Sequence, residues 1–348
     1  MGAPFSFWVA HRRRDGETMT ELERWIRETL KPERMTTAEL AYDHMESQSG
    51  ECLAVIYQPL DHTKRSHWHD TALIGAFAHA MGEARTVLDV GPGDGWPSLR
   101  VADRFERVVG IDPSPKRVEV QRENARRLGI TNVEFLVMDA EQMTFVDSEF
   151  DGVMAASAIE QCDHPERALA EVARVLRPGG RFAMIFEDYD GCFDGDDGDE
   201  ELWVQGDEGG GETGSIVMYQ VRTRVPAHET RYGVFVDTRG LESAGRAAPT
   251  VEFFKRIAPH VRRAGVYELD HMTSRTVDPL LERYGFGSIR HLNHRLTPVL
   301  EVFNEIQTAG ALDDHRDTFV DECLKLGVLA VEAAGEGPGD FVVADRRT

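Results

Sequence analysis

Asp89-Val90-Gly91-Pro92-Gly93-Asp94-Gly95 is a glycine-rich segment that lies between the apolar pair Val87-Leu88 and a helix-like stretch. Its three glycines stand on alternate positions, so no side chain separates a tight strand-to-helix turn from a ligand. Backbone N–H groups can therefore approach that ligand closely. The segment predicts a loop that binds a nucleoside cofactor.

The residues around this loop argue against two common nucleotide cofactors. A dinucleotide-binding loop needs a third glycine or alanine at position 96, where this chain has Trp96. An ATP-binding loop needs a lysine before a serine or threonine, and no lysine occurs between Arg85 and Arg107. Asp89, two positions before the first glycine, instead suits a cofactor whose near end is an amino acid with an ammonium group. S-adenosylmethionine carries such a group.

Composition narrows the class of protein and its surroundings. At 348 residues the chain has room for one large α/β domain and an accessory lobe. A formal net charge of −22 argues against nucleic acid or an anionic membrane as partner and favours a small-molecule substrate. Four widely spaced cysteines without a CxxC pair suit a reducing compartment, and no apolar run is long enough to span a bilayer. We therefore expect a cytoplasmic protein. Its oligomeric state stays open, a homodimer included.

Strands and helices alternate along residues 85–188. Short apolar segments rich in β-branched residues predict five strands, at residues 86–90, 107–111, 132–138, 150–155 and 181–186. Residues 114–128 and 165–176 have the spacing of helices with one buried face, and Pro178-Gly179-Gly180 is expected to end the second helix. Residues 276–284 predict a further helix, and residues 340–344 a last strand. This alternation predicts an α/β fold whose ligands bind at the carboxyl ends of parallel strands.

The remaining segments define the predicted division of the chain. Residues 1–68 hold helix-like stretches at 20–30 and 37–45, and we predict that they form an N-terminal helical lid. The core comprises residues 69–189 and 272–348, and residues 190–271 form an inserted α+β cap. The cap opens on an acidic stretch, residues 187–213, with twelve Asp or Glu and no Lys or Arg, which predicts a surface loop. A strand pair at 217–225 and 232–237 and a helix at 250–263 follow.

The core resembles the class I S-adenosylmethionine-dependent methyltransferases, in particular the small-molecule group typified by ubiquinone and menaquinone biosynthesis C-methyltransferases. The resemblance covers residues 85–188. It rests on the glycine loop, on Val109-Gly110-Ile111-Asp112, on Asp139-Ala140-Glu141, and on the stretch from Phe150-Asp151 to Arg177-Pro178-Gly179-Gly180. It implies a Rossmann-like, seven-stranded, mostly parallel sheet with an antiparallel last strand. It also implies an enzyme that uses S-adenosylmethionine to methylate O, N or C of a small organic acceptor.

The resemblance also implies a cofactor-binding set. In the family, the acidic residue that ends the second strand holds both ribose hydroxyls, and Asp112 stands there with a carboxylate that accepts two O–H donors. Asp139 is expected to accept from the adenine amino group and the N–H of Ala140 to donate to a ring nitrogen. Ser157, after the fourth strand, is expected to line the methionine moiety. The full predicted set is Asp89, Gly91, Gly93, Gly95, Asp112, Asp139, Ala140 and Ser157.

Methyl transfer from a sulfonium is an in-line displacement, which depends on close positioning and exclusion of water more than on a protein nucleophile. A general base is needed only when the acceptor must lose a proton. The family often has a histidine where this chain has Gln161, so candidates for the base are sought outside the core, at His228, His271 and Tyr57. The spacing of His, Cys, Asp and Glu predicts no metal site.

Three alternative functions stay open at this point. The acceptor could be RNA or protein, docked on arginines of the cap. It could be arsenite, held by the thiols of Cys52, Cys162 and Cys192. The chain could also bind S-adenosylmethionine without catalysing a reaction.

Overall fold

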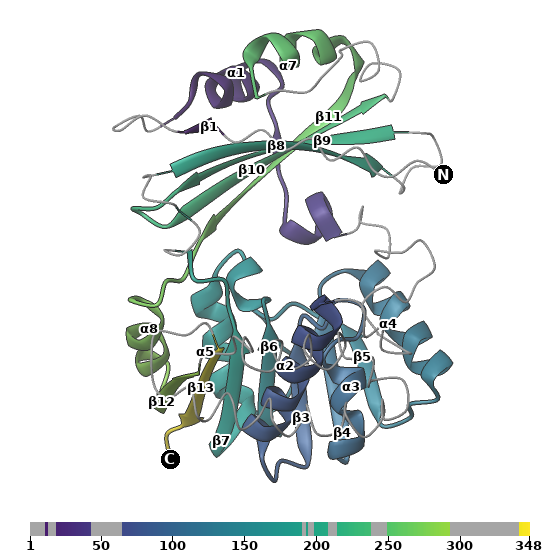
Figure 1. Cartoon of the computed structure of the whole chain (residues 1–348), viewed down its shortest axis with the longest axis vertical. Coiled ribbons are helices and arrows are strands. Elements are labelled where there is room, and N and C mark those ends of the chain that lie inside the picture. The colour runs from purple at the N-terminus through teal and green to yellow at the C-terminus, as the bar shows by residue number, and fades with distance from the viewer. Residues whose placement is uncertain are drawn as a thin grey trace, which may run out of the picture. The chain divides into compact units, whose positions relative to one another are not determined.

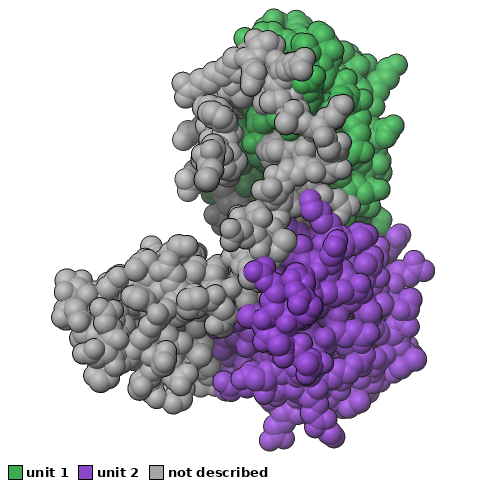
Figure 2. All heavy atoms as spheres, turned by 90° about the vertical axis from the view of Figure 1, so that its right-hand side faces the viewer, with its two compact units in different colours: residues 1–46, 160–164, 188–273 green, residues 47–159, 165–187, 274–348 purple. Residues whose placement is uncertain are grey.

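The structure of the protein is a computed structural model, which describes residues 11–12, 19–42, 65–189, 193, 198–207, 214–237, 249–292 and 341–348. The chain divides into two compact units, distinguished by colour in Figure 2. The insert unit comprises residues 1–46, 160–164 and 188–273, and the core unit comprises residues 47–159, 165–187 and 274–348. Each unit has its own β-sheet (Figure 1).

The core unit contains a seven-stranded sheet in the order β12-β13-β7-β6-β3-β4-β5. Its strands from β5 to β7 run parallel, and β13 runs antiparallel to both of its neighbours. This confirms the predicted mostly parallel sheet with an antiparallel last strand. The strands are β3 (Thr86–Val90), β4 (Arg107–Asp112), β5 (Val133–Val137), β6 (Phe150–Ala156), β7 (Leu176–Ile185), β12 (Phe286–Leu292) and β13 (Phe341–Arg346).

The helices of the core unit pack on this sheet (Figure 1). They are α2 (Arg65–Met81), α3 (Ser98–Val101), α4 (Pro115–Leu128), α5 (Pro165–Val175) and α8 (Val277–Arg283), with a 3-10 turn at Ala102–Arg104. α4 begins where predicted because the Ser114 side chain accepts the Arg117 N–H, and it ends at Gly129, whose φ of 69° is left-handed. On α2, the buried Phe77 packs into a cluster with Val87, Val108 and residues of β6, β7 and β13.

β7 starts earlier than predicted. We expected Pro178-Gly179-Gly180 to end a helix and the strand to begin at residue 181, but α5 ends at Val175 and β7 begins at Leu176. The pairing between β6 and β7 shifts register between Phe150 and Gly152, so these residues lie in an irregular start of the strand.

The insert unit is built around a six-stranded sheet in the order β1-β8-β9-β10-β11-β2, antiparallel except between β11 and β2. The strands are β1 (His11–Arg12), β2 (Glu33–Arg34), β8 (Gly198–Asp207), β9 (Gly214–Thr223), β10 (His228–Asp237) and β11 (Val261–Asp270). Helices α1 (Glu21–Thr29) and α7 (Val251–Ile257) cover one face (Figure 1). A π-helix at Ala38–Tyr42 packs on the other face, where a Cβ on Gly233 would lie 2.4 Å from Leu40 Cδ1.

The insert unit holds more strand than the sequence indicated. The N-terminal segment, predicted as a helical lid, provides α1 and the π-helix but also both edge strands of the sheet. The acidic stretch, predicted as a surface loop, contains β8. This strand forms because its acidic side chains find partners on β9: the Arg222 guanidinium donates to Asp199 at 2.7 and 2.5 Å, and Tyr219 Oη donates to Glu200 at 2.8 Å. The helix predicted at 250–263 ends at Ile257, before a 3-10 turn at Ala258–His260 that contains Pro259.

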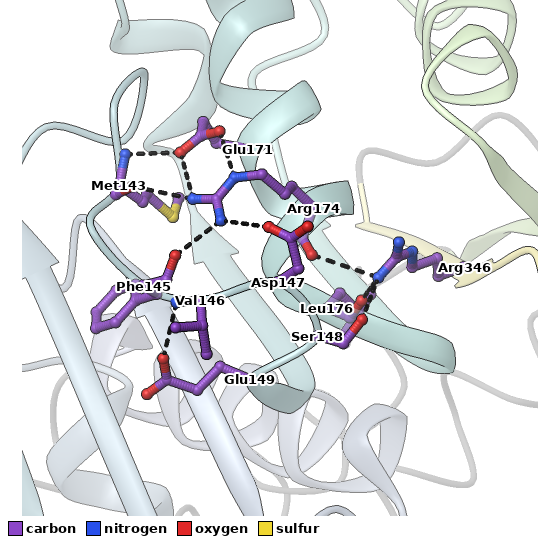
Figure 3. Close-up of polar contacts among 10 residues, drawn as sticks. All are labelled: Met143, Phe145, Val146, Asp147, Ser148, Glu149, Glu171, Arg174, Leu176 and Arg346. Carbon is purple, nitrogen blue, oxygen red and sulfur yellow. Dashed lines mark hydrogen bonds and ion pairs between the residues drawn. The ribbon is translucent and has the colours of Figure 1, made fainter.

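An arginine network holds the amino-terminal edge of the core sheet together (Figure 3). Arg174 on α5 donates to the carboxylates of Glu171 and Asp147 at 2.8 and 2.9 Å, and to the carbonyls of Phe145 and Met143 at 2.7 and 2.9 Å. From the end of β13, Arg346 donates to Ser148 Oγ at 3.1 Å and to the Leu176 carbonyl. The network thus ties the last strand to the loop before β6.

Candidate functional site

The glycine loop lies at the carboxyl end of β3, and each of its three glycines has a positive φ: 68° at Gly91, 57° at Gly93 and 111° at Gly95. The Gly91 N–H donates to the Ile111 carbonyl at 2.8 Å, which joins the loop to β4. A Cβ on Gly91 would lie 2.6 Å from Ala158 Cβ, whereas a Cβ on Gly93 would meet nothing within 4 Å. Backbone therefore packs closely at Gly91, and open space lies beside Gly93.

Asp89 is fully buried at the end of β3. Its Oδ2 accepts the Ser98 N–H at 3.0 Å and the Ser98 hydroxyl at 2.6 Å, which fixes the first residue of α3. Burial raises the pKa of Asp89 to about 7, and the nearby charge of Asp112 adds to the rise. Oδ1 is also buried and has no hydrogen-bond partner among the described residues. An uncompensated carboxylate oxygen of this kind suits a ligand cation.

Asp112 ends β4, the strand next to β3. It is 7% exposed, and its Oδ1 accepts the Ser114 N–H at 2.9 Å. Its Oδ2 lies 3.4 Å from Gln121 Nε2. Ser114 is the N-cap residue of α4, because its side chain accepts the Arg117 N–H. Asp112 therefore does not cap this helix.

Two further predicted positions follow the neighbouring strands. Asp139 lies after β5, is exposed, and accepts the Glu141 N–H on Oδ1 at 2.8 Å, while Ala140 is buried. Ser157 lies after β6, is exposed, and has a φ of 51°, a left-handed conformation that costs a non-glycine residue about 1 kcal/mol. Its N–H donates to the Ile185 carbonyl at 2.9 Å, which holds this conformation.

The predicted cofactor residues therefore gather at one edge. They follow β6, β3, β4 and β5, which are consecutive in the sheet, and all four strands are parallel. This is the edge at which doubly wound sheets bind ligands.

The family model of a methyltransferase domain matches residues 88–184 of the chain. An uncharacterized methyltransferase of Mycobacterium tuberculosis is 38% identical over 107 residues, which cover 31% of this chain and 42% of that protein. The ubiquinone/menaquinone biosynthesis C-methyltransferase UbiE of Brucella abortus is 36% identical over 122 residues, 34% of this chain and 45% of UbiE. Residues 88–184 thus form a methyltransferase domain of the S-adenosylmethionine-dependent class.

The chain matches less than half of the length of these curated relatives. Among solved structures, the YcgJ protein of Bacillus subtilis is 32% identical, with a TM-score of 0.33 over 34% of this chain and 51% of YcgJ. The cofactor of the methyltransferase domain is S-adenosylmethionine. The residues fit it: open space lies beside Gly93, Asp112 is a buried acceptor, and the unpartnered Asp89 Oδ1 suits an ammonium.

The three residues predicted to act as a base do not lie in the methyltransferase domain. Tyr57 falls outside the described residues. His228 pairs with Asp270 across β10 and β11, with 2.8 Å between Nδ1 and Oδ1. His271 is buried, and its ring stacks on Tyr189 with the centroids 4.1 Å apart.

His271 also lies beside a buried carboxylate. Its Nε2 is 3.4 Å from Glu229 Oε2, and neither ring nitrogen has a hydrogen-bond partner among the described residues. Burial opposes the ionisation of Glu229, but Arg231, whose Nη2 is 2.6 Å from Oε1, and His271 together hold the pKa of this carboxyl below its usual value.

Sequence reasoning missed the charged face around this pair. On this face of the insert sheet, Arg222 binds Asp199 and lies 5.6 Å over the ring of Phe193, and Arg231 lies 5.4 Å from the rings of both Trp203 and Tyr267. Burial raises the pKa of Glu201, which lies 3.3 Å from Arg222. The alternation of β9 predicts one polar face, but its acidic partners lay in a segment that we predicted as a loop.

The described part of the chain contains no group of three or more His, Cys, Asp or Glu residues that could hold a metal ion. Within the same residues, every helix is too short or too polar to cross a membrane.

Proposed function

We propose that this chain catalyses methyl transfer from S-adenosylmethionine to an O, N or C atom of a small organic molecule. The gathering of Asp89, Gly93, Asp112 and Ser157 at the carboxyl edge of three neighbouring parallel strands, β6, β3 and β4, carries the proposal. The net charge of −22 and the charged, aromatic face of the insert sheet support a small polar acceptor over a nucleic acid.

Each core residue has a defined task in this proposal. The bound cofactor supplies an electrophilic methyl group on a sulfonium. Asp112 would accept the ribose hydroxyls and Asp139 would accept from the adenine amino group, while the backbone at Gly93 would hold the methionine side. Asp89 Oδ1 faces the ammonium. These contacts fix the donor so that an acceptor approaches it in line.

We extend the proposal to His271 as the proton acceptor when the methylated atom carries a proton. Glu229, 3.4 Å from Nε2, would orient the ring so that Nδ1 can take the proton.

The first experiment is calorimetric titration of the full chain with S-adenosylmethionine and S-adenosylhomocysteine. We expect one site per chain and at least a tenfold weaker affinity in Asp112→Ala, since hydrogen bonds to a charged group are worth about 1.5–3 kcal/mol. Asp103→Ala is the matched control, because the Asp103 side chain is 80% exposed. Absence of binding to the unmodified chain, or equal losses in both variants, would refute the assignment.

The acceptor is then sought by release of S-adenosylhomocysteine from pools of phenols, amines and carbon acids. With an acceptor in hand, His271→Gln should lower kcat and remove the acidic limb of its pH profile, while the affinity for S-adenosylmethionine stays unchanged. An unaltered pH profile would exclude His271 as the base and leave the methyl-transfer proposal standing. Salt-dependent binding of RNA to the chain would instead indicate a macromolecular acceptor.

A further inference from the structure

Helix α4 turns a polar face toward the glycine loop. Arg117, Gln121 and Asn124 follow each other at helical spacing and are 6%, 0% and 0% exposed. Gln121 Nε2 donates to the Gly93 carbonyl at 2.7 Å, and Asn124 Nδ2 donates to the Asp94 carbonyl at 2.7 Å. Arg117 forms an ion pair with the Asp94 carboxylate. Side chains of α4 thus bind two consecutive residues of the loop, Gly93 and Asp94.

Burial of these polar side chains destabilises the fold unless each polar group has a hydrogen-bond partner. Burying an amide without a partner costs about 1–3 kcal/mol, and helices that pack on a loop more often present apolar side chains. The Asp94 and Arg117 side chains are 0% and 7% exposed, so the ion pair is shielded from water. Gln121 Oε1 is buried without a hydrogen-bond partner among the described residues, so the side-chain amide makes its contacts through Nε2.

The donor side of Gln121 reaches two groups at once. Besides the Gly93 carbonyl, Nε2 lies 3.4 Å from Asp112 Oδ2. An amide nitrogen carries two hydrogens, so one donor can face the loop carbonyl and the other the carboxylate. Asn124 has the same chemistry and the same burial, but the contact recorded for its amide nitrogen is with the loop alone.

We propose that Gln121 is a positioning residue for the cofactor, which couples the glycine loop to the carboxylate that holds the ribose. The Ser114 N–H on Oδ1 and the Gln121 amide on Oδ2 together fix the plane of the Asp112 carboxylate. Both carboxylate oxygens are then oriented before the cofactor arrives, and less ordering remains to be done on binding. The inference rests on the assignment of the ribose to Asp112.

The test is a cycle of protein variants and ligands, measured by calorimetry on the full chain. S-adenosylhomocysteine is compared with its 2′,3′-dideoxy analogue, which lacks both ribose hydroxyls. Gln121→Met preserves the length of the side chain without its donors, and Asn124→Leu is the matched control on the same helix face. We expect Gln121→Met to weaken S-adenosylhomocysteine binding about 5- to 20-fold, the equivalent of one to two hydrogen bonds, but dideoxy-analogue binding less than threefold.

The Asn124→Leu control distinguishes a residue that orients Asp112 from one that only stabilises the glycine loop. Asn124→Leu should weaken both ligands by the same factor, because it releases a loop carbonyl only. Equal losses for both ligands in Gln121→Met would overturn the proposal, since the residue would then act on the loop alone. If Gln121→Met does not fold by circular dichroism, Gln121→Glu keeps the volume and turns an acceptor toward Asp112. Its loss must likewise be larger for the ligand that has the hydroxyls.

The cofactor assignment fails in a different way. Should the unmodified chain bind S-adenosylhomocysteine and its dideoxy analogue equally well, Asp112 does not hold the ribose, whatever the variants do. The unmodified chain could bind the dideoxy analogue more weakly than S-adenosylhomocysteine, with the same ratio of affinities in Gln121→Met. That result would keep Asp112 as the ribose ligand and reject Gln121 as its positioning residue.

Discussion

Replacement of single glycines in the cofactor loop should separate loss of stability from loss of binding. Gly91 and Gly93 both have left-handed backbones, with φ of 68° and 57°. Their surroundings differ: an added Cβ would lie 2.6 Å from Ala158 Cβ at position 91 and would meet no atom of the described residues within 4 Å at position 93. An alanine at position 91 therefore collides with the protein, and an alanine at position 93 occupies the space that we assign to the cofactor.

The expected magnitudes follow from these contacts. A left-handed alanine costs about 1–2 kcal/mol at either position. Overpacking against Ala158 adds about 1–3 kcal/mol at position 91. Gly91→Ala should thus lower the free energy of unfolding by about 2–5 kcal/mol, and Gly93→Ala by about 1–2 kcal/mol. The affinity for S-adenosylmethionine should nevertheless fall at least tenfold in Gly93→Ala, because the methyl group blocks close approach to the backbone.

Urea unfolding followed by circular dichroism gives the first quantity, and calorimetric titration of the folded variants gives the second. The reasoning is refuted if Gly93→Ala binds S-adenosylmethionine as tightly as the unmodified chain, because the space beside Gly93 would then not belong to the cofactor. It is equally refuted if Gly91→Ala is no less stable than Gly93→Ala.

Two further variants test buried charge in the core unit. The pKa of Asp89 is raised from 3.8 to about 7, so the folded protein holds this proton more tightly than the unfolded chain, and stability falls as the pH rises between these values. The free energy of unfolding of Asp89→Asn, measured by urea unfolding, should therefore rise relative to that of the unmodified chain by on the order of 3 kcal/mol between pH 5 and pH 8. A difference in free energy of unfolding that does not change with pH would contradict the raised pKa. Arg174→Met should lower the free energy of unfolding by about 2 kcal/mol, since two carbonyls and two carboxylates lose a half-buried donor (Figure 3). The control is Arg167, which is exposed and lies 3.9 Å from Glu141, and Arg167→Met should lower the free energy of unfolding by less than about 0.5 kcal/mol. If both variants lower it equally, the network around Arg174 does not stabilise the fold more than an exposed ion pair does.

The core could be predicted because its signals are local. The strand at residues 86–90 is an apolar, β-branched run next to a glycine loop, and it has the predicted bounds. Asp112 and Ser157 could be placed near this loop without any contact information, since the carboxyl ends of parallel strands share an edge.

The insert could not be predicted in the same way, because its signals are distant. β8 pairs its acidic residues with arginine and tyrosine on β9, and a segment rich in Asp and Glu shows no sign of this when it is considered alone. Helix α4 shows a related limit. Its apolar residues predicted the helix, but Val120 is only partly buried, and polar residues such as Gln121 are fully buried. Apolar periodicity therefore located the helix but not the face that carries the loop contacts.

Several acidic side chains are buried close to the glycine loop. Asp89, Asp94 and Asp112 are all buried, and Asp94 forms an ion pair with Arg117. The charge of Asp112 reaches Asp89, because it contributes to the raised pKa of that carboxyl. We expect an ammonium or sulfonium group close to these acidic side chains to be stabilised by their charge.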